Sequence, residues 1–357
     1  MDEHHIRKML EGGGGAPGAL LRAALWLPGK AYGTAMRLRR AAYRAGLLAS
    51  RPAGAPVVSV GNLTAGGSGK TPFTIMLARG LAVRGMRPAI LLRGYRQSDT
   101  GLSDEAVLYR DRCPEAILEV GSDRVAGAER AIAAGADVII MDDGLQHLRL
   151  RRDMDIVLVD ATAPWGGGNT IPGGLLREPR DTLAQASIVV VTRSDQVSAE
   201  TLAGIRADAA SLAPGVPVLT ARHRPSGLRS LAGGTLPPDA LRARKVVAMS
   251  GIARPEAFHK TLEQLGASLA ATFAGRDHDH FDGAFLASAL EAARRNDAFL
   301  VITEKDRAKK IFARLADNNS VDNSNVRDRI WTLAIDQEVE ESGVLFALVS
   351  ECISSKK

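Results

Sequence analysis

Cysteine is scarce in this sequence: Cys113 and Cys352 are the only two, and they lie far apart without a Cys-x-x-Cys pair. This scarcity argues against a thiolate zinc site and a disulfide framework, and it fits a reducing cytoplasm. Long apolar runs are missing too, because none reaches the roughly 20 residues that span a bilayer. The opening Met1-Asp2-Glu3-His4-His5 does not resemble a secretory signal. Any membrane attachment is therefore expected to be peripheral.

Acidic residues are absent from Gly12 to Ser98, although the same stretch is rich in basic ones. The basic residues are Arg22, Lys30, Arg37, Arg39, Arg40, Arg44, Arg51, Lys70, Arg79, Arg84, Arg87, Arg93 and Arg96. The first quarter of the chain therefore presents charge of one sign to anionic partners. The whole chain has 46 basic and 40 acidic residues among 357, a net charge of +6, which is too small to predict nucleic-acid binding by itself.

Apolar and basic residues recur with helical spacing between Pro17 and Leu48, with an interruption at Pro28-Gly29. The simplest interpretation is two consecutive amphipathic helices, the second strongly basic on its polar side, after the four glycines 12–15. Helices of this kind commonly pack on the core of their own protein. Tryptophan and tyrosine beside acid-free, arginine-rich positions are also typical of helices in a membrane interface, and we favour that interpretation.

A short apolar run, Val57–Val60, leads into a glycine-rich turn that ends in Gly69-Lys70-Thr71. A strand, such a turn and a helix make up a phosphate-binding loop, in which backbone N–H groups and a lysine hold phosphate and a hydroxyl holds Mg²⁺. The strict G-x-x-x-x-G-K-[ST] pattern is missed by one residue, because Thr64 stands where glycine is required. We expect nucleotide contacts from Thr64, Ala65, Gly66, Gly67, Ser68, Gly69, Lys70 and Thr71.

Strand-like and helix-like runs alternate through the rest of the chain. The expected strands are 57–60, 88–92, 116–120, 136–141, 155–159, 187–192, 245–250, 268–273 and 299–303, and the expected helices are 72–84, 123–134, 255–265, 282–295 and one from 305. This alternation predicts an α/β fold with a doubly wound, mostly parallel sheet of the P-loop NTPase type. We expect three regions: N-terminal amphipathic helices (1–54), a P-loop kinase core (55–225), and a smaller C-terminal α/β domain (226–357) with a polar loop near 317–328.

Carboxylates close one of the expected strands: Val138–Met141 is apolar and is followed by Asp142 and Asp143. In a sheet that also carries a phosphate loop, such a strand end places an aspartate beside the Mg²⁺ held by the loop threonine. Either aspartate suits that position. Gly144-Leu145-Gln146-His147 then adds a bend, an amide and an imidazole next to the carboxylates.

Five segments together resemble, in the same order, those of the tetraacyldisaccharide 4'-kinases, the lipid A 4'-kinases of Gram-negative bacteria. They are Gly61–Pro72, Arg93-Gly94-Tyr95-Arg96, Asp142–His147, Leu176-Arg177-Glu178-Pro179 and Thr303-Glu304-Lys305-Asp306. The resemblance runs from the N-terminal helices to about residue 310, and the run Asp142–His147 is the most specific part of it.

The resemblance implies transfer of the γ-phosphoryl group of ATP to the 4'-hydroxyl of a tetraacylated glucosamine disaccharide 1-phosphate, a late step of lipid A biosynthesis. It implies ATP and Mg²⁺ as cofactors, and the lipid substrate and the membrane surface as partners, without nucleic acid. It also implies a peripheral enzyme on the cytoplasmic face of the inner membrane, with a smaller domain that closes over the nucleotide.

The resemblance further implies a reaction centre with an aspartate and a histidine. The aspartate is Asp104, where this chain reads Ser103-Asp104-Glu105 instead of Gly-Asp-Glu, and the histidine is His278 in the run 277–281, with His280 as a rival. Lys70 and Arg177 are expected to act on the transferred phosphoryl group. The expected metal ligands are Thr71, Asp142, Asp143 and Glu178, and the expected substrate contacts are Asn62, Arg93, Glu105, Arg124 and His147.

Several alternatives remain open from the sequence. The run Asp277-His278-Asp279-His280 can hold a metal, Asp104 can simply cap a helix, and Thr192–Asp195 follows a strand as a base-contacting segment does. A P-loop GTPase or metallochaperone-like switch is the main rival function, and a basic nucleic-acid-binding ATPase is another. Nucleotide preference and nucleic-acid-stimulated turnover distinguish them from the kinase.

Overall fold

The computed structural model describes residues 3–94, 103–275, 281–309, 311, 312, 315 and 326–356. Its chain forms two compact units. Unit 1 consists of Met1–Gly94, Cys113–Arg222 and Gln337–Lys357, and unit 2 of Tyr95–Arg112 and His223–Asp336. None of the helices in the described ranges combines the length and the apolar character that crossing a bilayer requires.

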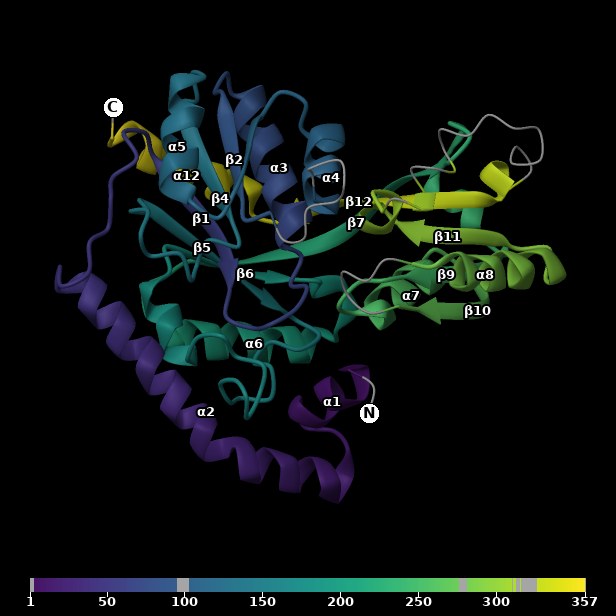
Figure 1. Cartoon of the computed structure of the whole chain (residues 1–357), viewed down its shortest axis with the longest axis horizontal. Helices are drawn as coiled ribbons and strands as arrows, with labels where there is room; N and C mark the ends of the chain where they lie inside the picture. Colours follow the sequence, from purple (N-terminus) through teal and green to yellow (C-terminus); the bar gives the residue numbers. More distant parts are fainter. Residues whose placement is uncertain are drawn as a thin grey trace. The chain divides into compact units, whose positions relative to one another are not determined.

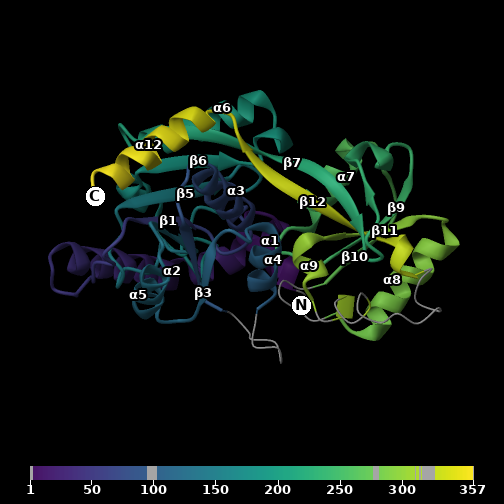
Figure 2. The same cartoon turned by 90° about the horizontal axis from the view of Figure 1, so that it is seen from above.

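Unit 1 is built on a sheet in the order β7-β6-β5-β1-β4-β2-β3, and Figures 1 and 2 show β6, β5 and β1 side by side. Its elements are α1 (Glu3–Leu10), α2 (Gly15–Arg44), β1 (Val57–Asn62), α3 (Lys70–Val83), β2 (Pro88–Leu92), β3 (Ile117–Val120), α5 (Arg124–Ala133), β4 (Val138–Asp142), β5 (Met154–Asp160), β6 (Ile188–Thr192), α6 (Ala199–Leu212), the start of β7 (Val218–Ser230) and α12 (Ser342–Ser354), with 3₁₀ turns at Arg180–Gln185 and Ser194–Gln196. All neighbouring pairs in this sheet are parallel, which confirms the predicted fold class.

Both faces of this sheet are buried, because its strands carry apolar residues at consecutive positions. Val57, Ile139 and Met141 pack with α5 on one face, while Val58, Val60 and Ile140 are just as buried. Buried parallel strands read as continuous apolar runs for this reason. The phosphate loop leaves β1, which lies between β4 and β5, so the loop stands at the carboxyl ends of the central strands, where doubly wound sheets bind ligands.

Unit 2 contains a second parallel sheet in the order β10-β9-β11-β12. Its elements are α4 (Asp104–Arg112), the end of β7 with its antiparallel partner β8 (Thr235–Leu236), a 3₁₀ turn at Pro238–Leu241, β9 (Lys245–Ser250), α7 (Pro255–Gln264), β10 (Ser268–Ala274), α8 (Gly283–Arg295), β11 (Phe299–Thr303), α9 (Glu304–Arg307) and most of β12 (Ile330–Val339). Its core gathers Val247, Leu300 and Ile330. Most of the predicted polar insertion, 316–325, lies outside the described residues.

The two units differ from the predicted domains at both ends of unit 2. Residues 95–112 belong to unit 2 rather than to the core, and Arg112 of α4 forms ion pairs there with Glu304 and Asp336. Residues 337–357 belong to unit 1, where Phe346 of α12 packs on Gly80 of α3. The N-terminal helices also belong to unit 1 instead of forming a region of their own.

The predicted break at Pro28-Gly29 is wrong, because α2 runs as one helix through Pro28 (Figure 1). Proline normally breaks a helix because it removes a hydrogen bond and clashes with the preceding turn. Here the segment around Thr170 packs on the helix at this point, and its hydroxyl donates to the Gly29 carbonyl. A Cβ on Gly29 would lie 2.7 Å from the Thr170 carbonyl oxygen, so glycine is needed for this close approach.

Candidate functional site

The phosphate loop has the backbone geometry that its glycines predict. Gly66 and Gly69 have φ values of 115° and 81°, a region that side chains other than glycine rarely adopt. Gly69 is the N-cap of α3, which begins at Lys70, two residues before the predicted start. The first N–H groups of α3 therefore open toward the loop, as a phosphate site requires.

Four polar side chains meet at this loop: Asn62, Lys70, Asp143 and Arg177. Both Arg177 Nη atoms donate to Asp143, at 2.7 and 2.9 Å, and the Lys70 Nζ lies 3.4 Å from the Asp143 carboxylate. The Asn62 Oδ1 accepts hydrogen bonds from Lys70, at 3.1 Å, and from Arg177. The structure thus brings together two positive charges, a carboxylate and an amide that the sequence analysis had singled out separately.

The charge of Asp143 is fixed by these neighbours. Burial by itself would raise its pKa, but the charge of Lys70, the hydrogen bond and charge of Arg177, and the charge of Arg124 lower the pKa far below its ordinary value. Asp143 also has a φ of 49°, an uncommon conformation for a residue with a side chain. The carboxylate is therefore ionised and held in one orientation at neutral pH.

Arginines of helix α2, together with Arg152, donate hydrogen bonds to backbone carbonyls of the turn 142–147. Arg40 donates to the Leu145 carbonyl at 2.8 Å and Arg39 to the Gln146 carbonyl at 3.1 Å, while Arg152 donates to the carbonyls of 144, 145 and 147. Gly61 is required next to this turn, since a Cβ there would lie 2.5 Å from the Leu145 Cβ. Some basic residues of α2 thus stabilise the fold, whereas the interfacial interpretation assigned the basic side of this helix to the membrane.

Glu178, predicted as a metal ligand, has a different partner. Its carboxylate is fully buried and accepts two hydrogen bonds from Arg40, Nε to Oε2 at 2.9 Å and Nη2 to Oε1 at 3.1 Å. The two hydrogen bonds take one lone pair on each carboxylate oxygen and hold Glu178 in one orientation. The structure therefore shows that Glu178 anchors α2, and its role as a metal ligand stays a prediction.

We expect Glu178→Gln to lower the stability of the protein by about 3–5 kcal/mol, because removing one partner leaves Arg40 buried without its counter-charge. The matched control is Asp181→Asn, which breaks the Arg37–Asp181 pair of the same helix, where both side chains are more than half exposed; such pairs contribute only about 0–1 kcal/mol. Urea unfolding of the two variants measures the difference. Equal small losses in both would contradict the anchoring role.

Arg193 and Thr192 support the loop from β6. The Arg193 guanidinium donates to the Gly67 carbonyl at 3.0 Å and pairs with the buried Asp160, and the Thr192 hydroxyl donates to the Ser68 carbonyl at 2.9 Å. The C=O and N–H of a trans peptide point in opposite directions. The hydrogen bonds to the Gly67 and Ser68 carbonyls therefore direct the N–H groups of the next residues away from Arg193 and Thr192. Thr192–Asp195 follows a strand as a base-contacting segment does, but in the structure its first two residues hold the phosphate loop.

Three other candidates lie near the same edge of the sheet. Arg124 is buried and donates to the carbonyls of Leu91 and Asp142, so it joins β2 to β4. Arg93 follows β2 and is exposed. Burial and four surrounding arginines lower the pKa of His147 to about 4, which keeps its imidazole neutral at pH 7. Arg124 is thus used at least partly for structure.

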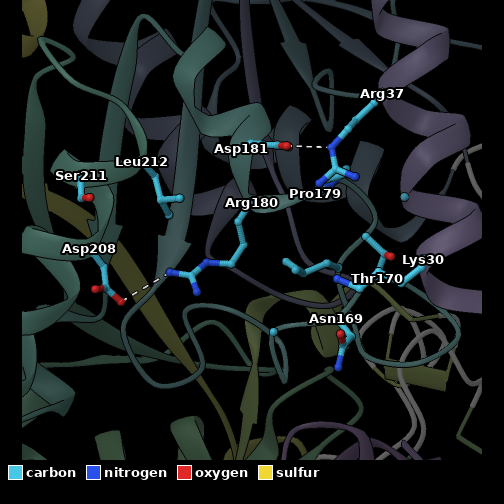
Figure 3. Close-up of a pocket in the computed structure, with 13 residues that line it drawn as sticks. Lys30, Arg37, Asn169, Thr170, Pro179, Arg180, Asp181, Asp208, Ser211 and Leu212 are labelled. Atoms are coloured by element: carbon cyan, nitrogen blue, oxygen red, sulfur yellow. Dashed lines mark hydrogen bonds and ion pairs between the residues drawn. The ribbon is translucent and has the colours of Figure 1, made fainter. Parts of the chain in front are cut away.

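A pocket of about 400 Å³ lies between α2, the loop 168–181 and α6 (Figure 3). Two ion pairs cross it, Arg37 with Asp181 and Arg180 with Asp208, and Lys30 stands at its α2 side. These pairs connect α2 and α6 to the loop between them. The pocket therefore lies where α2 and α6 dock on this loop, and none of the four residues of the cluster described above lines it.

Asp104, predicted for the reaction centre, and Glu105, predicted as a substrate contact, lie in the first turn of α4. The Ser103 hydroxyl accepts the N–H of Ala106 at 3.3 Å, so Ser103 rather than Asp104 supplies the helix cap. His278 and His280 lie outside the described residues, as do Tyr95 and Arg96. Among the residues that are described, no three His, Cys, Asp or Glu side chains form a metal-binding group.

Comparisons with known proteins agree on one family. A family model described as tetraacyldisaccharide-1-P 4'-kinase (LpxK) matches residues 21–353. A tetraacyldisaccharide 4'-kinase of Anaeromyxobacter sp. (strain K) is 39% identical over 346 residues, 91% of this chain and 89% of the relative, and that of Geobacter sulfurreducens is 38% identical over 85% and 88%. The crystal structure of LpxK from Aquifex aeolicus in complex with ATP is similar in fold, with a TM-score of 0.69, 24% identity and coverage of 93% and 99%.

Proposed function

We propose that this chain, which belongs to the tetraacyldisaccharide 4'-kinase family, acts in lipid A biosynthesis. It transfers the γ-phosphoryl group of ATP to the 4'-hydroxyl of a tetraacylated glucosamine disaccharide 1-phosphate. The observation that carries the proposal is the cluster of Lys70, Arg177 and Asp143 around Asn62 at the phosphate loop. Phosphoryl transfer needs positive charge positioned in advance where negative charge spreads over the phosphoryl oxygens. Lys70 and Arg177 supply two such charges.

The residues at the loop also suit a magnesium ion. Mg²⁺ takes few protein ligands, usually one or two carboxylates with water and phosphate oxygens, so the absence of a larger acidic group among the described residues fits it. We infer that the Thr71 hydroxyl and the Asp142 carboxylate hold it, since Asp142 ends β4 beside Val60 of β1 and Asp143 is oriented by Arg177. When bound, Mg²⁺ neutralises charge on the phosphate oxygens.

The remaining roles follow from where each residue stands. Asn62 accepts hydrogen bonds from both cations and keeps them pointed at the loop. Asp143 holds Arg177 in one rotamer by a bidentate pair. We propose that Asp104 takes the proton of the sugar hydroxyl and that His278 assists it. Arg93, Glu105 and neutral His147 are proposed substrate contacts.

The direct test is transfer of radiolabel from ATP to purified tetraacyldisaccharide 1-phosphate in mixed micelles. Formation of a labelled lipid and ADP in equal amounts is expected. GTP in place of ATP tests the switch-protein alternative, and added DNA or RNA tests the nucleic-acid-stimulated ATPase. Nucleotide hydrolysis without a labelled lipid would overturn the proposed function.

We further propose that one face of α2 contacts the membrane surface. Leu27 and Leu38 come seven and eighteen residues after Leu20, so the three project within about 20° of one another on a helix. They are 70%, 66% and 72% exposed, respectively. The buried Gly29, Gly33 and Arg40 lie on the opposite face. Exposed Lys30 and Arg44 lie to one side of the leucines, an arrangement suited to anionic lipid, while Arg37 on the same side pairs with Asp181.

We expect the triple variant Leu20→Ser/Leu27→Ser/Leu38→Ser to bind anionic vesicles at least about 10-fold more weakly, because a fully buried leucine contributes about 1.5–3 kcal/mol. Its apparent KM for lipid should rise more than its KM for ATP. Val83→Ser removes an aliphatic side chain that is even more exposed (87%) from α3 and is the control. Vesicle co-sedimentation at low and high salt measures both variants; unchanged binding of the triple variant would sink the membrane-face proposal. Deleting residues 1–50 is a poorer test, because it also removes Arg40.

A further inference from the structure

An arginine from the N-terminal helix lies against the phosphate loop. The Arg7 guanidinium covers Gly66 so closely that a Cβ on Gly66 would stand 2.4 Å from Nη2 and 2.8 Å from Nη1. The same Nη2 lies 3.5 Å from the Ala65 carbonyl oxygen. Arg7 belongs to α1, which precedes the part of the chain that the family model matches, residues 21–353.

Several contacts within unit 1 fix the position of Arg7. Its Nε donates to Glu11 Oε1 at 3.2 Å, one helical turn later, and its side chain is 18% exposed. Arg22 of α2 donates to the carbonyls of Met9 and Gly13 at the end of α1. Gly167 approaches the Leu10 carbonyl so closely that a Cβ there would stand 2.0 Å from its oxygen. Helix α1 is thus fastened to α2 and to the loop at 167, which holds Arg7 over Gly66.

We propose that Arg7 is an arginine supplied in cis to the transferred phosphoryl group, which deepens the proposed kinase function and rests on it. Arg7 contacts the first half of the loop, at Ala65 and Gly66, whereas Lys70 and Arg177 converge on Asn62. The Asn62 Nδ2 also reaches the Gly66 carbonyl, at 3.5 Å. Arg7 therefore approaches the same short backbone segment with a third positive charge.

In the reaction, a bond forms between the γ-phosphorus and the sugar oxygen, and the bond to the β–γ bridging oxygen breaks with its electron pair left on ADP. The hydroxyl proton passes to the base. Arg7 keeps its protons and donates hydrogen bonds to γ-phosphoryl oxygens, whose charge rises in the transition state. Arginines that do this raise kcat by about 10³–10⁵-fold in related phosphoryl-transfer enzymes.

The test compares Arg7→Ala, Arg7→Gln and Arg7→Lys with the control Lys8→Ala, whose side chain is exposed on the same helix. With saturating ATP and lipid in mixed micelles, we expect Arg7→Ala and Arg7→Gln to lower kcat by at least about 10²-fold, while KM for ATP changes by less than about 10-fold. Lysine should not restore the rate, because an ammonium lacks the planar fork. Lys8→Ala should keep wild-type kinetics.

Two outcomes would overturn the inference while leaving the kinase function intact. One is a kcat of Arg7→Ala within about threefold of the wild type. The other is a lower melting temperature and a higher KM for lipid at an unchanged kcat, with full rescue by lysine, which would mean that Arg7 only fastens α1. Added guanidinium ion separates folding from chemistry, since it should restore part of the kcat of Arg7→Ala. An inactive wild-type protein would instead count against the proposed function.

Discussion

Replacing Lys70 by alanine is expected to lower kcat at least about 10²-fold, without loss of membrane binding. Lys70 supplies a positive charge at the phosphate loop from inside a protein, where such a charge is screened less than in water, and removing one preorganised electrostatic contact commonly costs this much. The fold should survive, because Arg177 still pairs with Asp143 on both oxygens.

The control for this prediction is Arg79→Ala, which removes an exposed cation from the same helix. Transfer of label from Mg²⁺-ATP measures kcat, and thermal unfolding and vesicle co-sedimentation show whether the variants are folded and bound. Near-normal turnover by Lys70→Ala would refute the assignment of the phosphate loop, whereas loss of turnover in both variants would point to a general effect of charge.

Replacing Asp104 by alanine is expected to lower kcat by roughly 10²–10⁴-fold, the usual contribution of a positioned general base. The sugar hydroxyl is a poor nucleophile until it loses its proton as the phosphoryl group arrives. The alternative that Asp104 only caps α4 is weakened by Ser103, whose hydroxyl already accepts the Ala106 N–H. As an acid in the first turn, Asp104 contributes only about 0.3–1 kcal/mol to the helix, so stability should change little.

The proposed pairing of Asp104 with His278 gives this prediction a second test. If the two act as a unit, His278→Ala and the double variant should lose about as much kcat as Asp104→Ala alone, since such effects are non-additive. Asp111→Ala, at an exposed position of the same helix, serves as the control and should be neutral. Fully additive losses would retire the pair, and His280 and His147 would then be tested in the same role.

The sequence could not decide between two neighbouring candidates for the proposed metal site. Asp142 and Asp143 are adjacent and chemically identical, so no pattern along the chain distinguishes them. Their surroundings differ in the structure, because Asp143 pairs with Arg177 and Lys70 while Asp142 lies beside Val60 at the end of β4, and the proposal that Asp142 holds Mg²⁺ rests on this difference. Glu178 shows a related limit: its partner, Arg40, lies 138 positions earlier, and nothing in the local sequence indicates that contact.

The sequence by itself determined the phosphate loop, the parallel α/β architecture and the family. These depend on local features, namely a strand followed by a glycine turn and a helix, apolar runs long enough for buried strands, and short ordered motifs. The alternation of strand-like and helix-like runs also predicted the ends of most core strands to within one or two residues. It did not predict α1, α6, α12 or β12, whose apolar faces are recognisable only once their packing partners are known.

Only the tertiary structure decided what the basic N-terminal quarter does. The sequence treated its arginines as one field, yet Arg40 is 3% exposed and pairs with Glu178, Arg39 holds the turn at Gln146, and Arg7 lies on Gly66. A charge pattern gives the sign of the field but not the direction of each side chain. That direction is set by how α1 and α2 pack on the core, because burying an arginine is favourable only where a carboxylate or carbonyl oxygens meet it.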